Sequence, residues 1–142
     1  IQIEIPSIKE FFTLSPVPGF MDWMKTNNYD LYRDLKSNLT IETIMENKKS
    51  LCDLVRSYLL VSNRKDKKPN DSVTRFHIGN GASMHQINFL ADTSENAMRK
   101  SCSFMINYRY DISKIKINQE MYAANGQIQH KKIFEFILFD GH

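Results

Sequence analysis

A serine and a histidine in this sequence stand in settings that suit acid–base chemistry. Ser15 is part of the proline-rich segment Leu-Ser-Pro-Val-Pro-Gly-Phe at residues 14–20, and His77 lies just before the Gly-Asn-Gly of residues 79–81. Glycines at such a place let the backbone approach a ligand closely. A hydroxyl and an imidazole in contact can relay a proton, because imidazole titrates near the working pH. Taken alone, each residue also has an ordinary explanation, as a serine in a turn and a histidine in the core.

The two prolines beside Ser15 predict how it is held. The apolar run at residues 8–14 predicts a buried strand, and Pro16 ends it because proline lacks a backbone donor and disfavours helix at the preceding residue. Pro18 suits the first turn of a helix with Phe20, Trp23 and Met24 on one face. We therefore expect Ser15 on a strand-to-helix bend, with its side chain leaving the edge of a sheet.

A second strand is expected after His77. Residues 82–90 have two alternating faces that both mix polar and apolar side chains, which predicts a strand covered on both sides in an α/β sheet. Helical patterns fill residues 29–62, and a further helical stripe runs from residue 97 to 106. Residues 112–126 look polar and irregular, and residues 127–139 are weakly amphipathic. The expected helix caps are Thr40, Ser50 with Asp53, and Asp92 with Glu95.

The composition of the chain argues against several classes of protein. The chain has 142 residues, 42% of them hydrophobic and 25% charged, which is typical of one globular domain and argues against intrinsic disorder. The net charge of +3 is too small for a nucleic-acid footprint, and no apolar run approaches the roughly 18 residues of a membrane span. Cys52 and Cys102 fit small buried side chains in a reducing compartment rather than a disulfide framework.

Several common site patterns are missing from the sequence. There are four histidines but no HxxxH or CxxC motif, so a metal site is not expected. The Gly79-x-Gly81 pair lacks the third glycine of a dinucleotide loop and the lysine of a phosphate loop. No G-x-S-x-G motif occurs either, which disfavours a hydrolase with that nucleophile turn.

Three segments, in order along the chain, carry a family resemblance. They are residues 14–20, residues 76–82 (Phe-His-Ile-Gly-Asn-Gly-Ala) with residues 87–94, and residues 105–110 (Met-Ile-Asn-Tyr-Arg-Tyr). Together they resemble the C-terminal part of the catalytic domain of malonyl-CoA decarboxylase, over about residues 5–128, and bacterial members are the more similar. The resemblance implies that residues 1–142 are this part only. A helical N-terminal domain and the helix that binds the coenzyme A pyrophosphate would then lie upstream.

The resemblance also implies a fold, a reaction and residue roles. The fold would be a mixed α/β sheet like that of GNAT acetyltransferases. The reaction would be decarboxylation of malonyl-CoA to acetyl-CoA and carbon dioxide without metal or organic cofactor, and Ser15 and His77 would be the catalytic pair. Weaker candidates for donating to the enolate or orienting the imidazole are Asn80, Asn88, Tyr108 and Tyr110. The two tyrosines have an equal alternative as core residues at the end of a helix.

The expected partners are malonyl-CoA and acetyl-CoA, with no nucleic acid or membrane, and the full-length protein would oligomerise through its upstream domain. A cytoplasmic location is expected because the sequence has neither a signal peptide nor a Ser-Lys-Leu terminus, while organellar targeting stays open. Two other functions also stay open, an acyl-CoA acyltransferase of the same fold and a non-catalytic module that binds coenzyme A.

Geometry can test these expectations. The Ser15 hydroxyl and the His77 imidazole should converge within about 2.6–3.2 Å. Asn88, from the next strand, should reach the rim of the same cleft. The basic loop at residues 63–72 should lie at the edge of this cleft or beyond it, either as an ordinary solvated loop or as a contact for the phosphates of coenzyme A.

Overall fold

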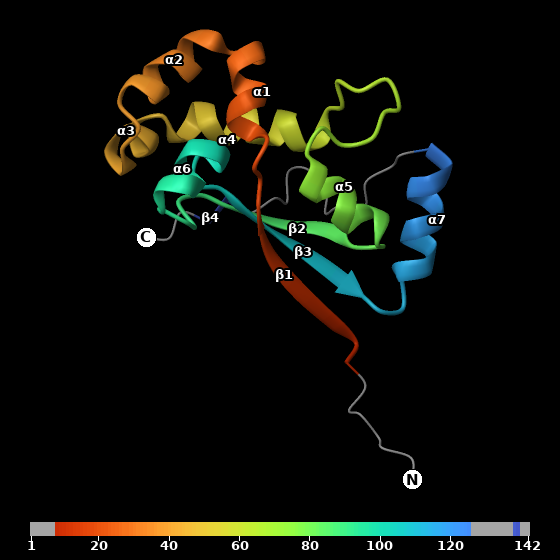
Figure 1. Ribbon diagram of the computed structural model, residues 1–142. Helices are drawn as coiled ribbons and strands as arrows, with labels where there is room; N and C mark the ends of the chain where they lie inside the picture. Colours follow the sequence, from red (N-terminus) through yellow and green to blue (C-terminus); the bar gives the residue numbers. More distant parts are fainter. Residues whose placement is uncertain (1–7, 126–137, 140–142) are drawn as a thin grey trace.

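The computed structural model describes residues 8–125 and 138–139. Its centre is a sheet of three antiparallel strands, β1 (Glu10–Pro16), β3 (Met105–Asp111) and β2 (Ser83–Asn88), with β3 in the middle (Figure 1). A two-residue strand, β4 (Leu138–Phe139), adds to β2 in the parallel direction. The mixed α/β class expected from the sequence is therefore confirmed.

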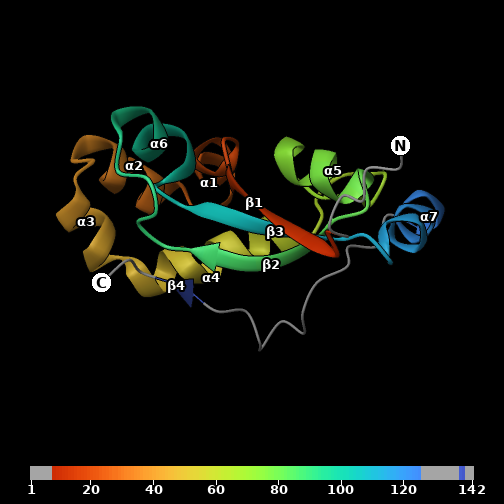
Figure 2. The same cartoon turned by 90° about the horizontal axis from the view of Figure 1, so that it is seen from below.

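The helices pack on one face of this sheet, which Figures 1 and 2 show from the side and from below. In β3 the buried side chains alternate with half-exposed ones: Ile106 and Tyr108 are fully buried, whereas their neighbours Asn107 and Arg109 are not. The other face carries Phe12 and Leu14 of β1, which are 46% and 54% exposed. Strands of an antiparallel sheet often have one covered and one open face in this way.

One expectation about the strands is therefore wrong. The strand at residues 8–14 exists, but within the described residues it is an edge strand with exposed apolar side chains rather than a buried one. The strand after His77 is β2, and its side chains are buried or half-buried on both faces, including Asn88 on the face away from the helices. Its mixed pattern comes from a bulge between Met84 and Gln86, because one extra residue, His85, offsets the alternation and lets Met84 and Ile87 both turn toward the helices.

The helices before the second strand are α1 (Phe20–Asn27), α2 (Tyr29–Ser37), α3 (Ile41–Glu46), α4 (Lys48–Leu60) and α5 (Ser72–Gly79). Thr40 caps α3 as expected, since its hydroxyl accepts from the Thr43 N–H at 3.1 Å. The Ser50 cap is wrong: α4 begins earlier, where the Asn47 carbonyl accepts from the Leu51 N–H at 2.9 Å.

Two further helices follow, α6 (Glu95–Ser101) and α7 (Ile115–Asn125). The cap of α6 is Ser94 instead of Asp92, and its hydroxyl accepts from the Ala97 N–H at 3.2 Å. Cys102 and Ser103 have positive φ angles of 50° and 64°, so the chain turns there and enters β3. The helical stripe expected up to residue 106 is therefore wrong beyond Ser101. Residues 112–126 were expected to be irregular, and α7 corrects this as well.

The core lies between the sheet and these helices. None of the described helices has the length and apolar character needed to span a bilayer. The expected amphipathic segment at residues 127–139 lies outside the described residues except for β4. The fully buried side chains of largest volume are Phe20, Met24, Leu35, Phe89, Phe104 and Tyr108.

Candidate active site

Ser15 and His77 meet on the covered face of the sheet. The Ser15 Oγ lies 2.9 Å from the His77 Nε2, and each residue is only 8% exposed. This distance falls in the range expected for a hydroxyl and an imidazole that share a proton, so the geometric prediction is confirmed. The two residues are 62 positions apart in the sequence, and the fold alone brings them together.

The local backbone explains how Ser15 is held. Ser15 pairs with Ile106 across β1 and β3, and paired residues of a sheet point to the same face, here toward the helices. Two residues later, the Val17 N–H donates to the Ser101 Oγ at 3.2 Å, which ties the connection between β1 and α1 to the end of α6. The expected strand-to-helix bend is therefore present, but it follows Pro16. Ser15 itself is still inside β1, and its side chain lies on the covered face of the sheet instead of leaving the sheet edge.

Tyr110 contacts the other nitrogen of the imidazole. Its hydroxyl lies 2.6 Å from the His77 Nδ1, so both ring nitrogens of His77 have a hydrogen-bond partner. The ring of Phe11 stacks on Tyr110 with a centroid distance of 4.7 Å and an interplanar angle of 4°. Burial lowers the pKa of His77 and raises the pKa of the Tyr110 phenol. Both groups are therefore held in their neutral forms near neutral pH.

Tyr108 supports the same imidazole from its face. Its ring stacks on His77 at 4.3 Å between centroids, and its hydroxyl lies 2.6 Å from the Thr74 Oγ1. Tyr108 and Tyr110 are both buried core residues, as the alternative expected, but they lie on β3 and not at the end of a helix. A residue without solvent exposure suits the orienting role better than direct contact with a substrate.

A buried carboxyl group continues this hydrogen-bond chain. Asp71 is fully buried and caps α5, where its Oδ2 accepts from the N–H groups of Val73 and Thr74 at 3.0 and 3.1 Å. The Tyr58 hydroxyl donates to the Asp71 Oδ1 at 2.7 Å, and burial raises the pKa of this phenol. Sequence patterns give no role to Tyr58, Asp71 or Thr74. The available signal was an aspartate directly before the helix that carries His77.

The glycines after His77 serve packing. Gly81 has a φ of 91°, and a Cβ placed on it would lie 2.6 Å from the carbonyl oxygen of Ile115 at the start of α7. The Asn118 amide donates to the Gly81 carbonyl at 3.0 Å. The close approach that Gly81 permits here is therefore to α7. Asn80 is the exposed C-cap residue of α5.

Asn88 does not face the Ser15–His77 pair. Asn88 pairs with Met105, whereas Ser15 pairs with the next residue, Ile106. Adjacent residues of a strand point to opposite faces, so the expectation that Asn88 reaches the same cleft is wrong. Its amide instead donates to the Asn107 Oδ1 at 2.8 Å on the face of the sheet away from the helices, where Asn88 is buried.

The basic loop lies at the far end of α5 from His77. It precedes the capping Asp71, whereas His77 is in the last turn of this helix. Arg64 pairs with Asp66 at 2.9 Å, and the Lys68 ammonium lies 5.3 Å from the ring centroid of Tyr122 on α7. In the described residues no three His, Cys, Asp or Glu side chains gather as they would around a metal ion. Both cysteines are buried and unpaired.

Comparison with known proteins places this chain in a family. The model of the family described as "Malonyl-CoA decarboxylase C-terminal domain" matches residues 1–138. The chain belongs to the malonyl-CoA decarboxylase family. The resemblance carried by the three ordered segments is therefore confirmed. The Ser15–His77 contact lies within the residues that this family model matches.

Solved structures and curated relatives agree with this assignment. The malonyl-CoA decarboxylase of Rhodopseudomonas palustris is 35% identical with a TM-score of 0.78, and the match covers 91% of this chain and 33% of that one. The enzyme of Agrobacterium vitis is also 35% identical, with a TM-score of 0.63 and coverages of 89% and 35%. The mitochondrial malonyl-CoA decarboxylase of Anser anser anser is 25% identical over 170 residues, which cover 96% of this chain and 34% of the relative. The chain thus spans about a third of the length of these relatives.

Proposed function

We propose that the full-length protein containing this chain decarboxylates malonyl-CoA to acetyl-CoA, and that Ser15 and His77 move the proton. The observation that carries the proposal is the 2.9 Å contact between the two side chains, in a chain that belongs to this family. Acetyl-CoA formation from malonyl-CoA would place the protein in the metabolism of fatty acids and their precursors.

The reaction demands little from the protein. The bond between the carboxylate carbon and the α-carbon breaks, carbon dioxide leaves, and the electron pair passes into the thioester carbonyl as an enolate. The protein must hold the carboxylate perpendicular to the thioester plane, exclude water, stabilise the enolate oxygen and return one proton to the α-carbon. Because the thioester carbonyl accepts the electrons, neither a metal nor an organic cofactor is required.

The contacts of His77 suggest how the proton is delivered. A neutral imidazole carries one N–H. If the Tyr110 hydroxyl donates to Nδ1, the ring proton is on Nε2, and Nε2–H donates to the Ser15 Oγ. The Ser15 O–H is then free to donate to the substrate. In the protonation step Ser15 gives its proton to the α-carbon and takes the Nε2 proton, while the Tyr110 hydroxyl proton passes to Nδ1, so the imidazole stays neutral. A proton from solvent then restores the Tyr110 hydroxyl.

The other expected site residues take different places in this proposal. Tyr110 and Tyr108 act as positioning residues for the imidazole, one at Nδ1 and one on the ring face. Asn80 is an exposed candidate for contact with the substrate. We further propose a GNAT-like fold for the full catalytic unit, with the coenzyme A pyrophosphate site upstream of this chain and with oligomerisation through the N-terminal domain.

The pH dependence of the reaction should follow the lowered pKa of His77. The ordinary pKa of histidine is about 6.5. Burial lowers it in the folded protein, so the imidazole stays neutral at and somewhat below this pH. Protonation would fill both ring nitrogens and prevent donation from Tyr110 to Nδ1. We expect kcat/KM to be flat near neutral pH and to fall on the acid side with an apparent pKa below about 6.5. An acid limb above pH 7 would contradict this assignment.

Carbon dioxide release from malonyl-CoA by the full-length protein tests the proposed function directly. We expect turnover to persist after exhaustive chelation, because the thioester itself is the electron sink. Activity that is lost on chelation and restored by a divalent ion would contradict the cofactor-free mechanism. The assay also separates the alternatives: an acyltransferase would transfer a malonyl or acetyl group to an added amine, and a binding module would bind coenzyme A without turnover.

A further inference from the structure

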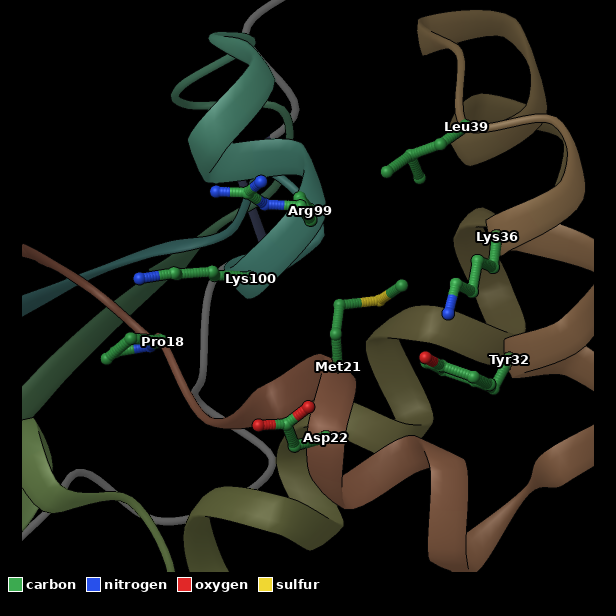
Figure 3. Close-up of a pocket in the computed structure, with 8 residues that line it drawn as sticks. All are labelled: Pro18, Met21, Asp22, Tyr32, Lys36, Leu39, Arg99 and Lys100. Atoms are coloured by element: carbon green, nitrogen blue, oxygen red, sulfur yellow. The ribbon is translucent and has the colours of Figure 1, made fainter.

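A pocket of about 420 Å³ lies between α1, α2 and α6 (Figure 3). Figure 3 shows Arg99 and Lys100 of α6 on one side, Lys36 and Leu39 on the other, and the Met21 side chain between them. The volume is within the range of pockets that bind small molecules. No residue of the Ser15–His77 pair or its hydrogen-bond network lines this pocket, so it is a second site.

The pocket has an excess of positive charge. Lys36, Arg99 and Lys100 line it together with one carboxylate, Asp22. Both Lys36 and Arg99 lie in the last turn of their helices, where the helix dipole favours cations, and the packing of α2 and α6 against α1 brings them to one cavity. The fold thus gathers on one small surface cations that come from two different helices.

One carboxylate leaves most of the positive charge of this pocket uncompensated. Within the part of the chain that the structure describes, none of the three cations forms an ion pair, whereas Arg33, Arg64 and Arg109 are all paired with acidic side chains. The Arg99 guanidinium donates once, to the Asn96 Oδ1 at 3.0 Å. The Lys36 ammonium lies 5.7 Å from the ring centroid of Tyr32. Most donors of these side chains therefore remain available to an anion.

The pocket also has an apolar lining. Met21 is 4% exposed and Leu39 is half-buried, and both line the cavity. A bare inorganic ion would not use such a surface, whereas the base or the carbon chain of a phosphorylated organic molecule would. Arginine and lysine together are the usual side chains for phosphate groups.

We propose that this pocket binds the phosphate of an anionic ligand through Lys36, Arg99 and Lys100. The pocket lies close to the candidate active site, because Pro18 lines it and is three residues beyond Ser15, at most about 11 Å away between Cα atoms. This inference rests on the proposed function. The phosphate has two sources: the phosphorylated adenosine end of the coenzyme A thioester, or a free phosphate compound. The chemistry that the pocket recognises is the same for both.

The test is calorimetric titration of the full-length protein with adenosine 3′,5′-bisphosphate and, separately, with inorganic phosphate. We compare the double variant Lys36→Gln/Arg99→Gln with Lys25→Gln/Arg33→Gln, which removes the same charge from exposed positions on α1 and α2 outside the pocket. Loss of two charge-assisted contacts should weaken bisphosphate binding by roughly 10–100-fold in the first variant only. No binding by the wild-type protein, or equal weakening in both variants, would overturn the proposal.

Kinetics with malonyl-CoA separates the two sources. A raised KM with unchanged kcat in the pocket variant assigns the pocket to the coenzyme A end of the substrate. An unchanged KM with lost bisphosphate binding assigns it to a free phosphate compound. Because the binding assay contains no malonyl group, failure of the decarboxylase proposal would leave its outcome intact.

Discussion

Replacing Ser15 or His77 by alanine in the full-length protein should lower kcat for malonyl-CoA decarboxylation by roughly 10²–10⁴-fold, the range for general acid–base groups. Each change removes one end of the 2.9 Å contact and leaves the α-carbon without its positioned proton donor. KM should change much less, because these side chains act on the reacting carbon rather than on the body of coenzyme A. Initial rates of carbon dioxide release over a range of malonyl-CoA concentrations give both constants.

Two matched variants control for nonspecific effects. Ser57→Ala removes an exposed hydroxyl from α4, and His85→Ala removes the imidazole at the bulge of β2. Both should keep kcat within about twofold of wild type, as expected for surface changes away from the site. A Ser15→Ala protein with wild-type kcat would remove Ser15 from the mechanism.

Replacing Asp71 by alanine should lower the local stability of α5, the helix that carries His77. The change deletes the acceptor for the Tyr58 hydroxyl and for the Val73 and Thr74 N–H groups, all within a buried site. Loss of an N-cap and a stranded buried donor together should cost about 3 kcal/mol of local stability. Hydrogen exchange of the α5 amides, measured by mass spectrometry on the full-length protein, should accelerate roughly 100-fold.

The matched variants for this prediction are Asp71→Asn and Asp53→Ala. Asparagine keeps an oxygen that accepts from the two N–H groups, while its NH2 can only donate to the Tyr58 oxygen, so the protection lost with the N-cap should return. Asp53 is a 63% exposed side chain on α4, and its removal should leave the exchange of α5 unchanged. Equal exchange in Asp71→Ala and wild type would show that α5 does not depend on this carboxyl group.

The meeting of Ser15 and His77 could be predicted from the sequence because several local signals agree there. Pro16 and Pro18 predict a strand-to-helix bend, and the apolar run before them predicts a strand. The segments that resemble the family identify His77 as the partner of Ser15. Tyr110 at Nδ1 could be named as a candidate but not placed, since its position depends on the register of β3 against β1. Register is a long-range property that no local pattern contains.

The predictions that were wrong also depend on features that local sequence patterns do not contain. The bulge at His85 shifts the alternation of β2, so the side chains that face the helices do not follow a regular period of two along this strand. Cys102 and Ser103 turn the chain with positive φ although neither is glycine, so nothing in the sequence marks the end of α6. The pocket of Lys36 and Arg99 depends on the packing of α2 and α6, which are more than 50 residues apart in the sequence, against the same helix α1, and no local pattern predicts this packing.

The central claim is that Ser15 and His77 act as one unit, and the double variant tests it most directly. We measure kcat of the full-length protein carrying Ser15→Ala, His77→Ala and both changes, under one set of conditions. Groups that serve a single proton transfer are not additive, so the double variant should lose little more than the worse single variant. A loss equal to the product of the two single losses would contradict the claim, because it would mean that the two side chains contribute independently.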